Sequence, residues 1–229
     1  MKITPRADQW QFIGDVYQAW NQGAVNVVGR ADTGFGKTVC LGQLVEQNQG
    51  AACVMAHRQE LVGQISMMLA KYGIRHNIIA ADATVRSIAA AHVAELGTCY
   101  YQPSAPVAVA GVDTLVRREV PEHWARQVTL TVPDEGHHVV RGNKWAEAMA
   151  LFPNARGFLP TATPARADGK GLGRHADGLA DRHDGLRSGT AGAVRRCGRR
   201  WASRGRTSRG ARCAVVGRLV PARRGRRVR

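Results

Sequence analysis

The glycine-rich segment Ala31–Thr38, ADTGFGKT, constrains the fold of this chain more than any other stretch. An apolar run precedes it at Ala24–Val28, and a run compatible with a helix follows it at Thr38–Gln47. A strand, a glycine-rich turn, Gly-Lys-Thr and a helix, in that order, are typical of a phosphate-binding loop. Gly34 and Gly36 allow a tight turn that brings backbone N–H groups onto phosphate oxygens. The helix that follows adds the positive end of its dipole.

Individual side chains of this loop have expected tasks. Lys37 is long enough to reach the β- and γ-phosphates of a nucleoside triphosphate, and the Thr38 hydroxyl can hold Mg²⁺. The general pattern asks for glycine where this chain has Ala31. Upstream, the Gln9 amide could read an adenine edge, or Gln9 could be an ordinary surface glutamine. With Gln9, the predicted ATP-binding residues are Thr33, Gly34, Phe35, Gly36, Lys37 and Thr38.

An acidic pair follows another predicted strand. The apolar run Gln127–Val132 ends in PDEGHH, residues 133–138. Asp134 can hold the Mg²⁺ shell, and Glu135 can orient and deprotonate an attacking water. His137 could sense the γ-phosphate or a neighbouring turn, whereas His138 reads as structural. An Asp-Glu pair alone is usually a polar turn, but together with the phosphate loop it favours the candidate catalytic set Lys37, Asp134, Glu135 and His137.

Further apolar runs alternate with helix-compatible segments, which predicts an α/β fold with a mostly parallel sheet. The additional strands are expected at Ala51–Ala56, His76–Asp82, Pro106–Gly111 and Ala155–Pro164. Arg58, after the first of these, could grip a nucleic-acid phosphate or be a solvated helix start. Thr114 could likewise bind a phosphate or cap a helix. Thr161 and Thr163 offer hydroxyls close to the phosphate end of the sheet.

Composition excludes several classes of protein. No run of 18 apolar residues is present, so no spanning helix is expected, and no secretion signal opens the sequence. The five cysteines form no CxxC pair, and the adjacent histidines His137 and His138 lack a third zinc ligand at useful spacing. Reduced thiols predict a cytoplasmic protein.

Five motifs together are similar to a known family. ADTGFGKT, AHRQEL, GVDTL, DEGHH and TATP occur in this order. The set resembles the first RecA-like domain of superfamily 2 helicases, closest to the DEAD/DEAH-box type that includes restriction and excision-repair helicases. The resemblance covers about residues 3–166 and implies a P-loop NTPase that uses ATP and Mg²⁺. It also implies a nucleic-acid partner, with DNA favoured over RNA by the family branch alone.

The resemblance implies a role for each matching residue. Lys37 and Thr38 match the phosphate-loop lysine and the Mg²⁺ ligand, and Ala31 is the family's usual residue. Asp134 and Glu135 match the second Mg²⁺ anchor and the catalytic base. The remaining matches are His137 with Thr161 and Thr163 for coupling, Arg58 and Thr114 for nucleic-acid backbone contacts, and Gln9 for reading adenine.

Two positions depart from the family's pattern. Gly136 stands where the family usually has alanine. Pro133 stands where it usually has an apolar residue that donates to the sheet. Proline removes that donor and fixes φ, so we expect the strand to end at Pro133 or to be slightly displaced.

Charge divides the chain in two. Residues 1–166 carry a net charge of +2 and are expected to form the domain, whereas residues 167–229 carry +14. From Gly185 to Arg229 there are 15 arginines, no lysine and no acid, and no helical or strand period is recognisable. We expect a disordered basic tail there. It is either a selected arm that binds nucleic acid through phosphate neutralisation, or, as we favour, a GC-rich gene read in the wrong frame.

The sequence thus predicts an ATP-dependent nucleic-acid helicase or translocase. Nothing after Pro164 resembles the second RecA-like domain, so we expect a truncated and poorly active enzyme. The alternative is a non-catalytic, basic nucleic-acid-binding module with a degenerate nucleotide fold. A small-molecule kinase would also begin from GxGKT, but it has no use for the DEGHH and TATP pair.

Overall fold

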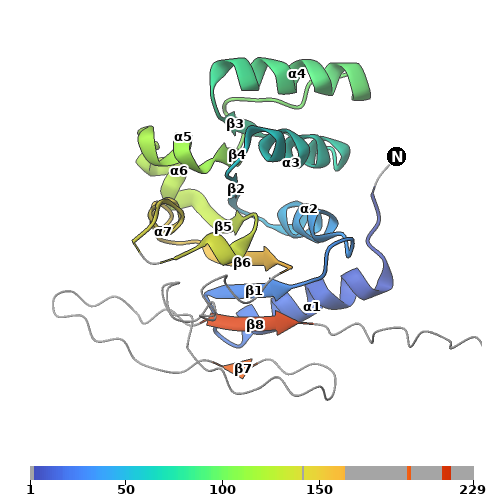
Figure 1. Cartoon of the computed structure of the whole chain (residues 1–229), viewed down its shortest axis with the longest axis vertical. Coiled ribbons are helices and arrows are strands. Elements are labelled where there is room, and N and C mark those ends of the chain that lie inside the picture. Colours follow the sequence, from blue (N-terminus) through green and yellow to red (C-terminus); the bar gives the residue numbers. More distant parts are fainter. Residues whose placement is uncertain (1–2, 141, 163–194, 197–212, 218–229) are drawn as a thin grey trace, which may run out of the picture.

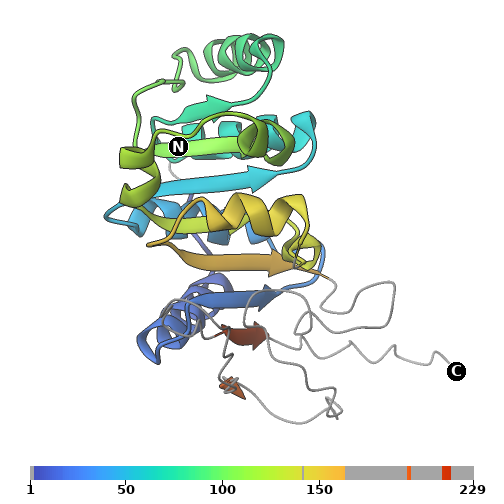
Figure 2. The ribbon, with the colours of Figure 1, turned by 90° about the vertical axis from the view of Figure 1, so that its left-hand side faces the viewer.

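Six parallel strands form the centre of the molecule. The structure is a computed structural model that describes residues 3–140, 142–162, 195–196 and 213–217. The central strands are β1 (Asn26–Arg30), β2 (Ala51–Ala56), β3 (Asn77–Ile79), β4 (Val107–Gly111), β5 (Val128–Pro133) and β6 (Arg156–Thr161). Their order is β3-β4-β2-β5-β6-β1, and every pairing among them is parallel. The strands run in the same direction (Figure 2), so their carboxyl ends share one edge of the sheet.

Helices cover both faces of this sheet. On one side lie α1 (Ala7–Asn21), α2 (Lys37–Gln47) and α3 (Gln59–Lys71), with α4 (Asp82–Leu96) packed on α3 (Figure 1). On the other side lie α5 (Val112–Arg117), α6 (Glu122–Gln127) and α7 (Lys144–Ala150). The predicted α/β fold with a mostly parallel sheet is confirmed.

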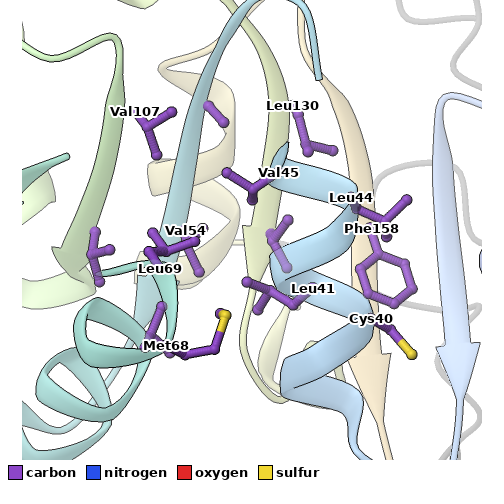
Figure 3. Close-up of a cluster of buried hydrophobic side chains, with 14 of the residues drawn as sticks. Cys40, Leu41, Leu44, Val45, Val54, Met68, Leu69, Val107, Leu130 and Phe158 are labelled. Carbon is purple, nitrogen blue, oxygen red and sulfur yellow. The ribbon is translucent and has the colours of Figure 1, made fainter. Parts of the chain in front are cut away.

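The packing between α2 and the sheet explains why the phosphate loop has a fixed position. Leu41, Leu44 and Val45 of α2 are buried against strand side chains such as Val54 and Phe158 (Figure 3). All six residues of β2 are buried, as expected for a strand covered on both faces. Each large apolar side chain contributes about 1.5–3 kcal/mol on burial. The amino end of α2 is therefore fixed relative to the neighbouring strands.

Some elements differ from the expectation. The strand predicted at His76–Asp82 is shorter, because α4 already begins at Asp82, while His76 forms an isolated bridge with Tyr101. β5 ends at Pro133 as predicted.

No helix in the described part of the chain is long and apolar enough to span a membrane.

Two strands lie in the segment for which the sequence predicts no regular structure. β8 (Cys213–Gly217) pairs with β1 in parallel, and β7 (Arg195–Arg196) pairs with β8 antiparallel. The sequence CAVVG is a short apolar run that contains two β-branched valines, which suits a strand. The rest of residues 167–229 lies outside the described ranges, so the disordered tail stays a prediction.

Candidate nucleotide site and nucleic-acid interface

The phosphate loop has the backbone that its glycines predict. Gly34 and Gly36 have φ values of 86° and 90°, in the left-handed region that side chains disfavour. A Cβ on Gly36 would also collide with the side-chain amide of Gln9. Gly36 precedes α2, and its carbonyl accepts from Val39 N at 2.9 Å and Cys40 N at 3.2 Å. The turn thus presents the amino end of α2, where backbone N–H groups favour anions.

The Lys37 side chain reaches back to the first residue of the phosphate loop. Its Nζ donates to the Ala31 carbonyl at 3.2 Å. The Ala31 N–H in turn donates to the Thr161 carbonyl at 3.0 Å, which joins the loop to the end of β6. Thr33 and Thr38 are exposed beside it, so the Thr38 hydroxyl is accessible to a ligand.

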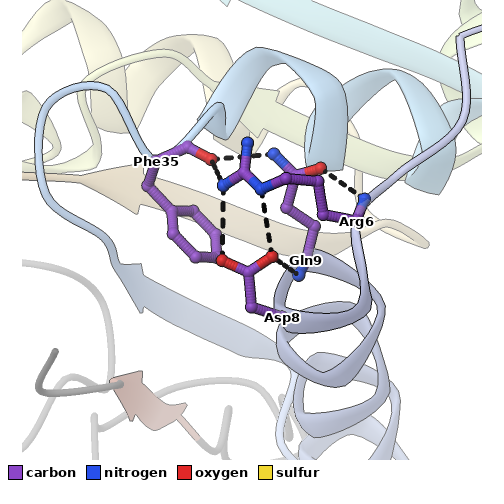
Figure 4. A network of polar contacts seen from close by, with 4 residues as sticks. All are labelled: Arg6, Asp8, Gln9 and Phe35. Carbon is purple, nitrogen blue, oxygen red and sulfur yellow. Dashed lines mark hydrogen bonds and ion pairs between the residues drawn. The ribbon is translucent and has the colours of Figure 1, made fainter.

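Gln9 holds the phosphate loop in place. It is only 2% exposed, so the interpretation as a surface glutamine is wrong. Its Nε2 donates to the Phe35 carbonyl at 2.8 Å, and its Oε1 accepts from Arg6 N at 2.9 Å (Figure 4). Arg6 Nη2 donates to the same Phe35 carbonyl at 2.9 Å while its Nε pairs with Asp8 at 3.2 Å. Whether Gln9 reads adenine stays a prediction.

Arg6 and Asp8 are participants that the sequence analysis missed. The only signal is their position just before Gln9 at the start of α1. The hydrogen bond from Arg6 lowers the pKa of the Asp8 carboxyl, which keeps this pair charged. The pair supports the phosphate loop through the Phe35 carbonyl.

Asp134 lies at the carboxyl edge of the sheet, near the phosphate loop. Its N–H donates to the Met55 carbonyl at 2.8 Å, which extends the pairing of β5 with β2 by one bond. Burial raises the pKa of the Asp134 carboxyl, and the neighbouring Glu135 carboxylate adds to this. The positive charge of Lys37 acts in the opposite direction. Contacts place these groups at the same edge of the sheet. Lys37 donates to the Ala31 carbonyl, Ala31 N–H donates to the Thr161 carbonyl, and His137 joins the Thr161 hydroxyl to Glu135.

The donor atoms at this place suit Mg²⁺. The Asp134 carboxylate and the Thr38 hydroxyl are hard oxygen donors, and a divalent cation would relieve the repulsion between Asp134 and Glu135. Mg²⁺ is commonly held by one or two protein ligands together with phosphate oxygens and water. The described residues contain no cluster of three His, Cys, Asp or Glu side chains that could hold a metal ion.

His137 brings two more of the predicted residues together. Its Nδ1 lies 3.0 Å from Thr161 Oγ1 and 3.2 Å from Glu135 Oε2. Glu135 has a φ of 60°, a conformation that costs of the order of 1–3 kcal/mol for a residue with a side chain. Such strain is typical of sites whose geometry is fixed by function. Thr163, the other predicted coupling residue, lies outside the described residues.

The departure at Gly136 has a structural reason. Gly136 opens the short 3-10 helix η1 (Gly136–His138), which packs directly on β6. A Cβ at Gly136 would lie 2.6 Å from the Leu159 Cβ and 2.9 Å from its carbonyl oxygen. Glycine therefore allows η1, and with it His137, to approach Thr161.

The two predicted nucleic-acid residues lie on neighbouring strand ends. Arg58 is exposed and precedes α3, one residue beyond the end of β2. Thr114 lies in α5, which directly follows β4. Since Ala56 of β2 pairs with Gly111 of β4, both residues lie at the carboxyl edge of the sheet. Thr114 is not a helix cap, because Gly111 occupies the N-cap position of α5. Their contact with nucleic acid stays a prediction.

His57, Asn143 and Trp145 also adjoin the site, and the sequence assigned none of them a role. His57 lies between β2 and Arg58, and its Nδ1 is buried with no hydrogen-bond partner among the described residues. Asn143 and Trp145 lie where α7 begins. An apolar strand followed at once by histidine was the only sequence signal, since the contacts come from separate elements.

The sheet order, the phosphate loop and the carboxylates at one edge define a RecA-like P-loop domain. A model of the family described as type III restriction enzyme, res subunit, matches residues 2–166. The chain therefore belongs to this family, and the resemblance to the first RecA-like domain of superfamily 2 helicases is confirmed. The match is to the res subunit rather than specifically to the DEAD-box type.

Solved structures support the fold. The UvsW helicase of bacteriophage T4 aligns with a TM-score of 0.51 and 16% identity, over 71% of this chain and 54% of that one. A second T4 UvsW structure aligns with a TM-score of 0.50 and 16% identity, over 70% and 30%. The chain thus spans about half the length of the first of these. Comparison with curated proteins gives no significant match.

Proposed function

We propose that this domain binds ATP and Mg²⁺ at the amino end of α2 and hydrolyses ATP in response to nucleic acid. The observation that carries the proposal is a series of contacts at one edge of the sheet, which joins Lys37 on the phosphate loop, through Ala31, Thr161 and His137, to Glu135 beside Asp134 at the end of β5. These groups come from segments about a hundred residues apart. A binding module without catalysis would have no need to bring two carboxylates to a phosphate loop.

Each residue has a role in this proposal. Lys37 would exchange the Ala31 carbonyl for the β- and γ-phosphates, and the N–H groups of the loop would bind their oxygens. Thr38 and Asp134 would hold Mg²⁺, which neutralises charge on the phosphates when bound. Glu135 would orient and deprotonate the attacking water. His137, between Glu135 and Thr161, would keep the base directed at the phosphate.

Turnover by this chain alone should be slow. The family match covers one RecA-like domain, and helicases of this kind receive their arginine fingers from a second. Loss of an arginine finger lowers the rate by about 10³–10⁵. The nucleic-acid partner would lie along Arg58 and Thr114, with DNA favoured over RNA by the family resemblance. A DNA-stimulated turnover typical of an intact helicase would contradict the expected loss.

Binding of a fluorescent ATP analogue with Mg²⁺ tests the proposal. Lys37→Ala should weaken binding tenfold or more, about 1.4 kcal/mol, because Lys37 contacts two phosphates. Lys71→Ala is the matched control, since Lys71 is a half-exposed lysine at the carboxyl end of α3 that pairs with Glu95 of α4. If the analogue binds equally well to both variants and to the unchanged chain, the alternative of a non-catalytic, basic nucleic-acid-binding module is favoured.

A further inference from the structure

The His57 ring forms a contact that the site described above leaves unexplained. Its Nδ1 is buried and has no hydrogen-bond partner among the described residues. The ring centroid lies 5.3 Å from that of His138, edge to face, and 6.3 Å from that of Trp145. A buried polar atom without a partner is unusual in a folded protein and calls for an explanation.

The two partners of His57 also contact each other. His138 and Trp145 stack with an interplanar angle of 15° and a centroid distance of 5.7 Å, and Trp145 is only 4% exposed. Asn143 joins them: its Nδ2 donates to the His138 carbonyl at 2.8 Å, and its Oδ1 accepts from Trp145 N at 3.1 Å. We call residues 136–140 together with residues 142–145 the connector.

One end of the connector lies on the nucleotide side. It follows Glu135 directly, and the His137 ring lies 4.2 Å from the His138 ring while its Nδ1 faces Thr161. A displacement of His138 must therefore move His137 and the residue proposed as the base. Packed side chains transmit such displacements because protein interiors have few voids.

Two residues next to the proposed nucleic-acid contacts lie against the connector. His57 precedes Arg58 in the chain and packs on His138 and Trp145. Asp113 precedes Thr114 and pairs with Lys144 Nζ at 2.8 Å. The immediate neighbour of each proposed nucleic-acid residue thus contacts the connector, and the His57 contact is the buried one.

We propose that His57, through its contact with His138 and Trp145, couples nucleic-acid binding at Arg58 to nucleotide binding at the phosphate loop. This inference rests on the proposed function. His57 is a positioning residue, since it acts through the connector. A phosphate that draws Arg58 outward shifts the turn after β2, and the His57 ring shifts the connector. The unpartnered Nδ1 makes the present position of the ring less favourable, which leaves it free to move on binding.

Coupling of this kind is measured as a ratio of affinities. The full chain is titrated with the fluorescent ATP analogue and Mg²⁺, with and without saturating oligothymidylate, and the coupling factor is the ratio of the two Kd values. The factor should be about fivefold or more for the unchanged chain. In His57→Ala it should fall to about one, while the Kd without oligothymidylate changes less than about twofold.

Two further variants show whether the ring transmits the effect. His57→Phe keeps an aromatic ring without Nδ1, so it should retain most of the coupling factor. His57→Leu fills a comparable volume without a ring and should lose it, and it replaces His57→Ala if that variant unfolds at a lower temperature. His123→Ala is the matched control, because His123 is an exposed residue of α6. This variant should keep the coupling factor of the unchanged chain.

The inference and the proposed function fail in different ways. If Lys37→Ala abolishes analogue binding but the unchanged chain has a coupling factor of one, the inference is wrong and the nucleotide site stands. The inference is also wrong, and the nucleotide site still stands, if His57→Ala and His57→Leu keep the coupling factor or if His57→Phe loses it. If the unchanged chain does not bind the analogue, both proposals are wrong.

Discussion

At the scale of single residues, the close approach of η1 to β6 depends on Gly136. Gly136→Ala would place a methyl group 2.6 Å from the Leu159 Cβ, against backbone that cannot yield easily. We expect the free energy of unfolding to fall by about 1–3 kcal/mol, the usual range for overpacking. Denaturant unfolding measures this change.

A second glycine supplies the control for that experiment. Gly14 lies in α1 with no atom within 4 Å of where its Cβ would be. Gly14→Ala should therefore stabilise the protein by up to about 1 kcal/mol through helix propensity. Equal effects of the two substitutions would mean that the contact with Leu159 is not tight.

At the scale of secondary-structure elements, a buried hydrogen-bond chain joins α3, the start of β3 and α4. The Ile74 carbonyl can only accept, so His76 Nδ1 donates to it at 2.8 Å and His76 Nε2 accepts from Ser66 Oγ at 2.6 Å. Ser66 Oγ then accepts from His92 Nε2 at 3.1 Å, and His92 Nδ1 accepts from Tyr100 N at 3.4 Å. Both histidines are neutral in this arrangement.

Removal of the hydroxyl in the middle of this chain should be costly. Ser66→Ala leaves His76 Nε2 without a donor and His92 Nε2 without an acceptor inside the protein. An unsatisfied buried group costs about 1–3 kcal/mol, and we expect a loss of stability in that range by denaturant unfolding. Ser87→Ala, at an exposed position of α4, should change stability by less than about 0.5 kcal/mol. A similar small change for Ser66→Ala would contradict the hydrogen-bond chain.

The same chain predicts a pH dependence of stability. Burial lowers the pKa of His76 to about 4, and burial also lowers the pKa of His92. An unfolded histidine titrates near its ordinary value of about 6.5, so below that pH the unfolded chain binds more protons than the folded one. The contribution of His76 is complete above about pH 6.5 and is lost progressively towards pH 4, by about 3 kcal/mol in all.

Unfolding free energies measured between pH 7 and pH 5 check this sign. The decrease on acidification should be clearly smaller in His76→Gln, which cannot take up the proton. His123→Ala should keep the full decrease, because His123 is exposed. An unchanged decrease in His76→Gln would show that the stability loss has another origin.

At the scale of the whole molecule, nucleic-acid binding through the basic residues should be independent of nucleotide binding at the phosphate loop. The chain carries a net charge of +16, most of it in residues 167–229. Binding of oligothymidylate should weaken steeply as salt rises, because phosphate neutralisation releases counterions. Lys37→Ala should leave the affinity for oligothymidylate at low salt nearly unchanged while it weakens nucleotide binding tenfold or more. A parallel loss of both activities in this variant would contradict the separation.

The sequence predicts elements better than it predicts contacts between them. The strands, α2 and the left-handed glycines follow from local apolar runs and from backbone freedom, which a short segment determines by itself. The burial of Gln9, the contact of His57 with His138 and the chain through Ser66 each join residues from separate elements. Such pairs are set by the packing of the whole sheet. For the same reason, the pairing of β8 with β1 could not be read from CAVVG alone.

The placement of Lys37 and Asp134 at one edge of the sheet carries the account, and one measurement tests it directly. A crystal structure of the protein with Mg²⁺ and a non-hydrolysable ATP analogue should show Lys37 Nζ on the terminal phosphates and Mg²⁺ beside the Thr38 hydroxyl and the Asp134 carboxylate. Nucleotide bound elsewhere, or bound at the loop with Asp134 and Glu135 remote from its phosphates, would contradict the account.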